Sequence, residues 1–294
     1  MKSIAVTGAN GMVGSHMISL LYNKRVPFKA VTRKVWDLSK WKTFNELDLI
    51  FRSVIGIFHF GAHLQYTDFK NNNKQTQKIF DTNVRSCLNL GEWAKLRNVP
   101  IVFLSSATVY EDPYASKILE TNARNINKLG GFYGYSKILA EDIFNNLSKN
   151  GLKCIVLRPS SIYGYGLPPE KLVQNFVNIS SSGKLIKVKG SKNKINFIHA
   201  HDVANAALQA FNKEAWGVYN VSSDKQNSIL EVAETVISVL GSKSIIKINN
   251  KKNYVPFSRF DLNCKLAKNF FGFKTMVSLR DGIRLIKNKM LQPY

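Results

Sequence analysis

The sequence predicts an α/β fold, with a doubly wound parallel sheet and a smaller, mixed α/β region toward the C-terminus. Two observations lead to this class. Short apolar runs that suit buried strands recur at residues 4–6, 28–32, 54–60 and 101–104. Segments with helical spacing of apolar residues separate these runs, and such alternation is typical of parallel sheets. Beyond about residue 160 the alternation becomes less regular, which indicates a second region.

The first predicted strand and the first predicted helix are joined by three glycines, at the spacing Gly8-x-x-Gly11-x-x-Gly14, with the helix over residues 12–22. Glycines allow a tight turn and a close approach of backbone to phosphate, while the helix N-terminus favours an anion. In this position the pattern predicts a Rossmann-type site for the pyrophosphate of a dinucleotide. An ordinary strand-to-helix turn is the alternative.

The second predicted strand, residues 28–32, runs into Arg33 and Lys34. Sites for NAD usually have an acidic residue near the end of this strand, whereas an arginine there accommodates the 2′-phosphate of NADP. No acid is present, so the sequence favours NADP(H), with NAD(H) possible. A solvated turn would also explain the two basic residues. Residues 35–38 follow at once, and we expect a short link to the third strand, residues 54–60.

Polar residues follow the next buried strands. A long helix is predicted over residues 75–97, and the strand at residues 101–104 is followed by Ser105 to Tyr110. Ligands of doubly wound sheets lie beyond the carboxyl ends of the strands, and this polar segment begins at such an end.

A tyrosine and a lysine lie four residues apart, on one face of a helix predicted from residue 132 to about 147. The charge of Lys137 lowers the proton affinity of the Tyr133 hydroxyl, which makes Tyr133 a candidate general acid or base. By itself the Tyr-x-x-x-Lys spacing usually indicates a surface helix. Here it lies downstream of the glycine pattern and of the pair Ser105-Ser106, and this combination favours a catalytic role.

The remaining elements are expected in the following order: a sixth strand at 152–157, a helix near 170–179, a strand entering a helix at 196–203, a strand at 216–221, a helix opened by the capping box Ser228–Glu231 and ending near 240, and a mostly helical tail at 261–289. We expect a dinucleotide-binding domain over residues 1–160, to which residues 196–221 return. Residues 161–195 and 222–294 would form a substrate-binding region.

Composition restricts the possible partners. The 294 residues are 45% hydrophobic and 21% charged, which is typical of a globular protein with a substantial core. The net charge of +23 raises the question of nucleic-acid binding. The lysines are scattered, with denser stretches at 184–194 and 243–252. We favour compositional bias combined with anionic ligands, and expect no specific nucleic-acid partner.

The three cysteines (Cys87, Cys154 and Cys264) are far apart and odd in number, so we expect reduced, buried thiols and no metal. No apolar run approaches the roughly 20 residues that span a bilayer. The glycine motif occupies the N-terminus, so no signal peptide is expected. These features predict a cytoplasmic protein with no membrane partner.

Together these motifs resemble one family along nearly the whole chain. The matching residues are Thr7 to Gly14, His59-Phe60-Gly61-Ala62, Asn83, Ser105 to Tyr110, Tyr133-x-x-x-Lys137, Arg158-Pro159, Phe197-Ile198-His199 and Asp261 to Lys274. The chain is similar to the extended short-chain dehydrogenase/reductases that act on nucleotide sugars. The run from Arg33 to Leu38 looks most like that of the 4-keto-sugar reductases.

The resemblance implies a catalytic triad of Ser106, Tyr133 and Lys137, in which Tyr133 moves a proton to or from a sugar oxygen. It implies that the sugar contacts Thr108, Ser161, Lys171 and Arg259. The cofactor residues that it implies are Gly8, Asn10, Gly11, Met12, Val13, Gly14, Arg33, Lys34, Asp37, Leu38, Phe60, Gly61, Ala62, Asn83, Tyr133, Lys137 and Pro159. Family members are often dimers, so a homodimer through the helices of residues 75–97 and 133–147 is expected.

Three functions remain open: an NADPH-dependent reductase of a keto group, probably C4, on a nucleotide-diphosphate sugar; an NAD-dependent 4-epimerase; and a non-catalytic member that senses NADP or binds RNA. The intact triad argues against the third. Sugar dehydratases of the family carry an Asp-Glu pair after the catalytic hydroxyl residue, where this chain has Ala107-Thr108. Thr108 and Lys171 also stand near the positions of the cysteine and histidine with which some relatives epimerise adjacent carbons.

Overall fold

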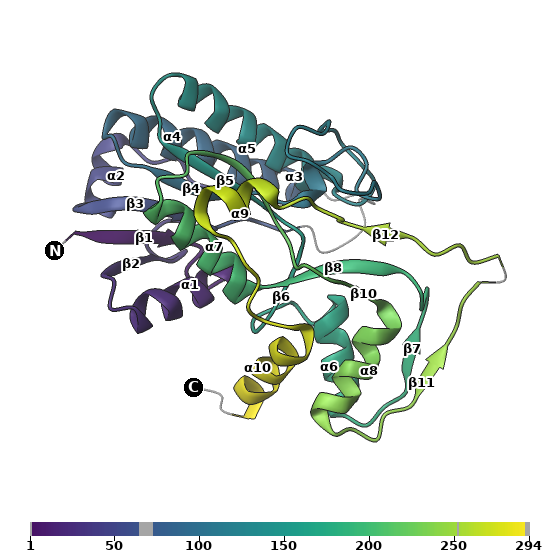
Figure 1. The fold of residues 1–294 in the computed structure, drawn as a ribbon. Helices are drawn as coiled ribbons and strands as arrows, with labels where there is room; N and C mark the ends of the chain where they lie inside the picture. Colours follow the sequence, from purple (N-terminus) through teal and green to yellow (C-terminus); the bar gives the residue numbers. More distant parts are fainter. Residues whose placement is uncertain (1, 65–72, 252, 292–294) are drawn as a thin grey trace.

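The computed structural model describes residues 2–64, 73–251 and 253–291, and its main sheet has six parallel strands in the order β2-β1-β3-β4-β5-β9 (Figure 1). These strands are β1 Ser3–Thr7, β2 Phe28–Val31, β3 Val54–His59, β4 Ile101–Leu104, β5 Cys154–Pro159 and β9 Gly217–Val221. Val6 of β1 pairs with Ala30 on one side and Phe58 on the other. The predicted fold class is confirmed, and the strand order reverses between β1 and β3, where such sheets bind ligands.

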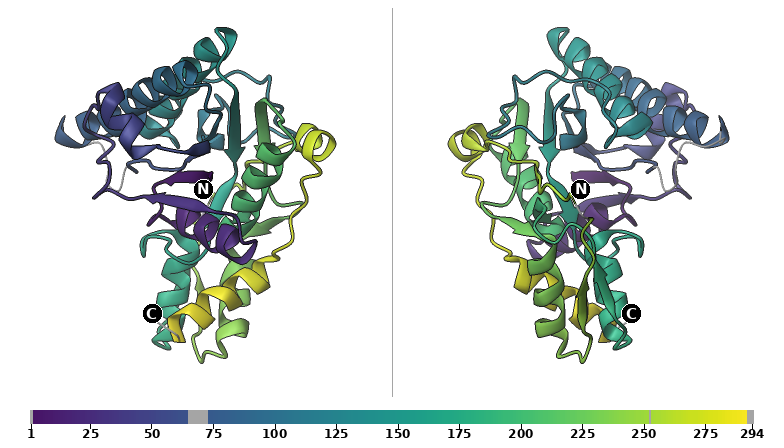
Figure 2. Two further views of the ribbon diagram at one scale, coloured as in Figure 1. Left: turned by 90° about the vertical axis from the view of Figure 1, so that its left-hand side faces the viewer. Right: turned by 90° about the vertical axis from the view of Figure 1, so that its right-hand side faces the viewer.

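Helices cover both faces of the main sheet (Figures 1 and 2). Helices α1 (Met12–Asn23) and α7 (Ala200–Asn212) bury one cluster of apolar side chains against the sheet, Met17 and Val203 among them. Helices α2 (Phe44–Ile50), α4 (Ser86–Leu96) and α5 (Gly131–Lys149) bury a second cluster on the opposite face. Burial of these two apolar stripes fixes each helix on the sheet.

Three predicted elements differ from the structure. The link between β2 and β3 contains helix α2, which Thr43 and Glu46 open with a capping box. The long predicted helix is divided by a π-helical turn, η1 (Asp81–Arg85), which separates α3 (Asn73–Phe80) from α4. The strand at residues 152–157, expected as the sixth, is β5, the fifth strand of the chain.

The C-terminal region adds two small sheets and four helices, three of which surround a third apolar cluster below the main sheet in Figure 1. The fourth, α9 (Lys265–Phe271), packs instead on α7 and β9. Strand β8 (Lys194–His199) pairs with three other strands and belongs to this region, whereas α7 and β9 return to the main sheet. The other elements are β6 Ser161–Tyr163, α6 Leu172–Ser181, β7 Ile186–Val188, β10 Gln226–Ser228, α8 Ile229–Leu240, β11 Ile246–Ile248, β12 Ser258–Arg259, α9 Lys265–Phe271 and α10 Leu279–Leu291. A 3₁₀ turn, η2 (Ala107–Val109), follows β4.

The C-terminal segment is tied back to earlier parts of the chain by buried polar groups. The Asp202 carboxylate at the start of α7 accepts hydrogen bonds from the backbone N–H groups of Met276 and Val277, each at 3.1 Å. The Tyr163 hydroxyl donates to the Ser278 carbonyl at 3.1 Å. These bonds fix the approach to α10. Within the described ranges, no helix has the length and hydropathy needed to cross a bilayer.

A buried ion pair joins α5 to β5. The Glu141 carboxylate accepts hydrogen bonds from Arg158 at 2.6 Å (Nη2) and 3.0 Å (Nε), and from Arg124 Nη1 at 3.1 Å. The Ser105 hydroxyl donates to the same carboxylate. The side chains of Glu141 and Arg158 are only 3% and 4% exposed. The pair therefore connects the ends of β4 and β5 to one helix.

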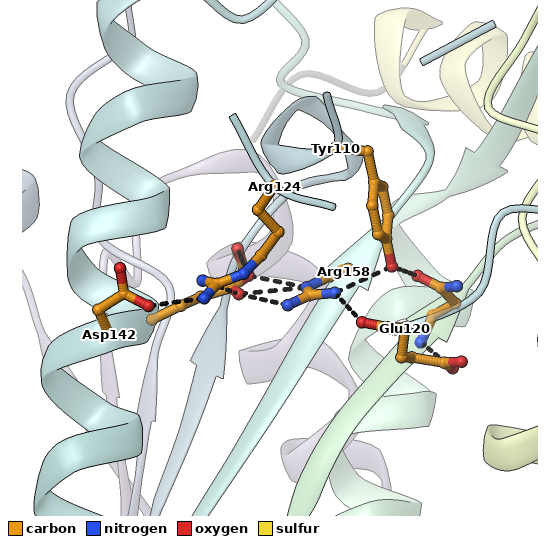
Figure 3. A network of polar contacts seen from close by, with 8 residues as sticks. Tyr110, Glu120, Arg124, Asp142 and Arg158 are labelled. Carbon is orange, nitrogen blue, oxygen red and sulfur yellow. Dashed lines mark hydrogen bonds and ion pairs between the residues drawn. The ribbon is translucent and has the colours of Figure 1, made fainter. Parts of the chain in front are cut away.

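The Nη1 group of Arg158, which does not bind Glu141, also has hydrogen-bond acceptors. Figure 3 shows its guanidinium between Arg124 and Tyr110, and its Nη1 donates to the Tyr110 hydroxyl at 3.1 Å and to the Glu120 carbonyl at 2.8 Å. Burial lowers the pKa of Arg158, but the hydrogen bonds and charge of Glu141 more than offset this and raise it above its ordinary value. The guanidinium therefore stays charged.

Glu141→Gln keeps the size of the side chain but leaves Arg158 without its counter-charge. We expect the free energy of unfolding to fall by about 3–5 kcal/mol, the usual loss when one partner of a buried pair is removed. The matched control is Asp142→Asn on the same helix, because Asp142 also pairs with Arg124 but is 51% exposed. We expect that control to lose at most about 1 kcal/mol. Urea unfolding at neutral pH measures both, and equal losses would contradict the prediction.

Candidate functional site

The glycine turn after β1 packs directly against the end of β3. Gly8 has a φ of +64°, and a Cβ there would lie 2.6 Å from the Cα of Gly61. A Cβ at Gly14 would lie 2.1 Å from the Gly8 carbonyl oxygen. Only glycine fits both positions, so the turn can pack tightly on itself and on the segment after β3. The N-cap Gly11 gives no side-chain cap, so its turn leaves backbone N–H groups for an anion.

A cleft of about 770 Å³ lies beyond the carboxyl ends of the strands. It brings together most of the residues predicted for cofactor and substrate. Those that line it are Gly8, Gly11, Met12, Val13, Gly14, Phe60, Ala62, Ser106, Thr108, Tyr133, Lys137, Pro159, Ser161, Lys171 and Arg259. The predicted triad and the glycine turn therefore share one cavity.

Ser106 and Thr108 lie together at the 3₁₀ turn after β4. The Ser106 Oγ accepts hydrogen bonds from the Thr108 backbone N–H at 3.2 Å and from the Thr108 hydroxyl at 2.9 Å. Both bonds occupy acceptor positions of Ser106. Its own hydroxyl proton is then directed to a further acceptor, such as an oxygen in the cleft.

Lys137 is buried one helical turn after Tyr133. Its Nζ donates to the Leu104 carbonyl at 2.7 Å and lies 4.6 Å from the centroid of the Phe103 ring and 5.8 Å from that of Tyr133. Burial lowers the pKa of Lys137 to about 8, partly offset by Cys87 and Glu141. The end of β4 thus holds the ammonium beside the Tyr133 ring.

Two predicted cofactor residues have a visible structural role away from the cleft wall. Asn83, in the π-helical turn, accepts a hydrogen bond from the His63 N–H at 2.7 Å and donates to the Ser136 hydroxyl at 3.0 Å. It thereby joins the segment after β3 to α5. Leu38 packs on Gly61, because a Cβ added at Gly61 would lie 2.4 Å from Leu38 Cδ1.

The other predicted cofactor residues outside the cleft wall lie on the surface near the ends of β1 and β2. Asn10, Arg33 and Lys34 are exposed. Asp37 accepts bonds from the N–H and hydroxyl of Ser39. Burial raises the pKa of Asp37, but these bonds and the charge of Arg33 together hold it below its usual value. Arg33 follows β2 with no acid at the strand end.

The opposite wall of the cleft is basic. Arg259 on β12 pairs through its backbone with Ile195, and its guanidinium lies 5.4 Å from the centroid of the Phe260 ring. Its Nε is buried and has no hydrogen-bond partner among the described residues, and burial lowers the pKa of the guanidinium. Lys171 and Lys128 line the same cavity. An anion would satisfy the unpaired Arg259 donor.

Sequence reasoning missed the loop before α5. The Asn127 Nδ2 donates to the carbonyls of Thr108 and Tyr110 at 2.9 and 2.7 Å, and its Oδ1 accepts from Gly130 N–H. A Cβ at Gly130 would lie 2.8 Å from the Thr108 carbonyl oxygen. The loop therefore places Lys128 on the cleft wall. The pair Gly130-Gly131 just before the tyrosine segment was the available signal.

Proton-transfer groups in the cleft are few. No Asp, Glu, His or Cys is among the described residues that line it. The nearby His59 is buried, bonded to the Thr7 hydroxyl at 2.8 Å, and burial lowers its pKa to about 3. Across the described chain, no cluster of three His, Cys, Asp or Glu residues suits a metal ion. Tyr133 and Lys137 are thus the titratable pair at the triad.

Comparison with known proteins gives relatives over the full length. UDP-glucuronic acid decarboxylase 6 of Arabidopsis thaliana is 26% identical over 304 aligned residues, which cover 97% of this chain and 87% of that protein. UDP-glucuronic acid decarboxylase 1 of Danio rerio is 24% identical and covers 100% of this chain and 72% of that protein.

Solved structures share the fold. UDP-N-acetylglucosamine 4-epimerase from Bacillus cereus has a TM-score of 0.85 at 22% identity, covering 100% of this chain and 98% of that one. UDP-glucuronic acid 4-epimerase from Bacillus cereus, in complex with NAD, has a TM-score of 0.82 at 19% identity and covers both chains completely. The model of the NAD dependent epimerase/dehydratase family matches residues 4–222. With most of the chain matched, the resemblance found in its motifs is confirmed, and the protein belongs to the NAD dependent epimerase/dehydratase family.

Proposed function

We propose that the protein reduces a keto group, at C4, of a nucleotide-diphosphate sugar with NADPH. The observation that carries this proposal is the chemistry of the cleft. Tyr133 and Lys137 lie beside the glycine turn, and no described lining residue is a carboxylate, imidazole or thiol. Reduction of a carbonyl needs one hydride and one proton, and this set of groups supplies the proton.

The glycine turn fits a dinucleotide. Gly8, Gly11 and Gly14 line the cleft without side chains, and the uncapped start of α1 offers backbone N–H groups to a pyrophosphate. A bound nicotinamide dinucleotide would supply the hydride. Arg33 and Lys34 would hold a 2′-phosphate at the end of β2. Lys137 would orient the nicotinamide ribose from the base of the cleft.

The protein's own groups act on the keto oxygen. Ser106, whose acceptor positions are occupied by Thr108, donates a hydrogen bond to that oxygen. Tyr133 donates the proton, and the adjacent Lys137 ammonium stabilises the phenolate that remains. The two donors polarise the carbonyl before the hydride arrives.

The basic wall supports a diphosphate substrate. Arg259 offers a buried, unpaired donor, and Lys171 lies in the same cavity. A diphosphate carries the charge and the acceptor oxygens to satisfy both. The named relatives act on UDP-sugars, which are ligands of this class. Arg259 therefore supplies the positive charge that a diphosphate needs, which Ser161, a neutral side chain in the same cavity, cannot supply.

Elimination and inversion of neighbouring carbons are less well supported. Both require a second group that removes a proton from carbon, commonly a carboxylate, histidine or cysteine. Thr108 stands next to Ser106, and its hydroxyl is engaged with the Ser106 Oγ. A 4-epimerase with bound NAD is the alternative, since it also needs only one proton-transfer group at the C4 oxygen.

We further infer a cytoplasmic homodimer. The three cysteines are buried and unpaired, which suits a reducing compartment. The helical run α3 to α4 and helix α5 contact each other on one face of the main sheet. Because family members often form dimers, we propose this helical layer as the dimer contact.

The cofactor assignment is tested at Arg33. We expect Arg33→Ala to weaken NADPH binding by about 10-fold or more, because charged hydrogen bonds contribute about 1.5–3 kcal/mol. NADH lacks the 2′-phosphate, so its affinity should change little. Arg52→Ala, an exposed arginine just before β3, is the matched control. Cofactor fluorescence titration measures all four affinities, and equal losses for NADPH and NADH would exclude Arg33 as the phosphate ligand.

The proton donor is tested at Tyr133. We expect Tyr133→Phe to reduce turnover by about 10²–10⁴-fold, the usual contribution of general acid–base catalysis. The unfolding temperature and the NADPH affinity should stay unchanged, because the substitution removes one hydroxyl group and little side-chain volume. Tyr135→Phe is the matched control on the same helix, since Tyr135 packs on Phe132 and does not line the cleft. Near-normal turnover of Tyr133→Phe would assign the proton to another group.

The reaction itself is tested by isotope. With NADPH and a 4-keto nucleotide sugar in deuterated water, we expect one NADPH to be oxidised per alcohol formed. No deuterium should enter the carbons beside the new alcohol, because the described cleft wall offers no base for them. NMR of the product, against a no-enzyme control, measures both. Deuterium at those carbons would show epimerisation, and interconversion of 4-hydroxy epimers without NADPH loss would support the epimerase.

A further inference from the structure

The two lysine-rich stretches of the sequence meet in one place. Strands β7 and β11 pair in parallel as a two-stranded ribbon, with Lys187 directly opposite Lys247. We define the basic ribbon as residues 184–189 and 243–249. It stands at the outer edge of the C-terminal region, at the right of Figure 1. Segments nearly 60 residues apart in sequence thus form one surface.

The two faces of the ribbon differ. Ile186 and Val188 are fully buried and pack in the third apolar cluster against α8. Side chains alternate along a strand, so their neighbours point outward. The outward face carries Leu185 and Ile245 at one end, 44% and 72% exposed. Its exposed cations are Lys187 and Lys247 on the strands, Lys189 directly after β7, and Lys184 and Lys243 shortly before β7 and β11.

This face has no internal charge compensation. Residues 171–201 and 235–260 contain no Asp or Glu. None of the five lysines has an ion-pair partner among the described residues. Like charges directly opposite on paired strands are destabilising. An external anionic surface would remove that repulsion between Lys187 and Lys247.

We propose that the basic ribbon docks the protein on an anionic phospholipid bilayer. Lysine and exposed aliphatic side chains together suit the lipid interface, where the ammonium groups meet headgroups and Leu185 and Ile245 enter the acyl boundary. Single-stranded nucleic acid is instead held by aromatic stacking and arginine, and the ribbon contains neither. This docking is peripheral and requires no membrane-spanning helix, and it revises the expectation of no membrane partner.

Docking leaves the cleft open. No ribbon residue is among the described residues that line the cleft. The enzyme would therefore bind cofactor and substrate while it is held at the membrane. Each lysine near an anionic bilayer raises affinity about fivefold, and several together bind appreciably at moderate salt.

The test is co-sedimentation with phosphatidylcholine vesicles that contain about 30% phosphatidylserine. We expect binding that pure phosphatidylcholine vesicles do not give and that about 0.5 M KCl abolishes by screening. Lys187→Glu with Lys247→Glu should weaken it about 100-fold or more, since two charges are reversed. Ile245→Ser should weaken it severalfold. The matched control is Lys24→Glu with Lys213→Glu, two exposed lysines outside the ribbon and outside the helices of the proposed dimer contact, which should bind like the wild type.

Unfolding temperature and NADPH affinity should be unchanged in all these variants, which shows that the fold is intact. Failure of the wild-type protein to bind the anionic vesicles would overturn the proposal. Equal loss in the two double variants would also overturn it, because binding would then follow total charge. Single-stranded RNA that displaces the protein from the vesicles and whose binding depends on Lys187 and Lys247 would assign the ribbon to nucleic acid instead.

Discussion

The buried pair of Glu141 and Arg158 is the interaction on which the site depends. Glu141 lies one helical turn beyond Lys137 on α5, and it binds Ser105, the neighbour of Ser106. Arg158 lies on β5, so the pair fixes two strand ends and one helix relative to each other. Such a pair contributes little net stability compared with apolar packing. Its value here is geometric, because the proposed proton donor and its helpers project from exactly these elements, and small displacements would separate them.

The arrangement also explains why a short polar turn can direct hydrogen bonds. Asn127 holds the Thr108 carbonyl, and Thr108 in turn occupies the acceptor positions of Ser106. Asn127 therefore fixes the position of Thr108, and Thr108 fills the acceptor positions of the Ser106 hydroxyl. The Ser106 hydroxyl proton is then available to an acceptor in the cleft. Pre-set donors of this kind need no rearrangement when charge develops on a substrate oxygen.

Those parts of the fold and of the candidate site that depend on neighbouring residues could be predicted from the sequence, whereas those that depend on distant segments could not. The glycine turn was predictable, because Gly8 and Gly14 are required by contacts with their immediate structural neighbours. Helix α2 was missed although Thr43 and Glu46 form a capping box and Phe44, Leu47 and Ile50 have helical spacing, because its seven residues repeat that spacing over only two turns. The role of Asn127 depends on carbonyls that only the folded chain brings near, and the pairing of β7 with β11 joins segments that carry no mutual sequence signal.

The ties made by the C-terminal segment bear on how the chain acquires its structure during synthesis. Asp202 binds Met276 and Val277, Tyr163 binds Ser278, and β12 pairs with β8. These contacts close long loops, which slows folding because chain entropy is lost before the contacts form. The cleft wall that holds Arg259 leaves the ribosome long after the glycine turn, because the two are about 250 residues apart in the sequence. A nascent chain therefore carries its glycine turn long before the opposite wall of the cleft exists.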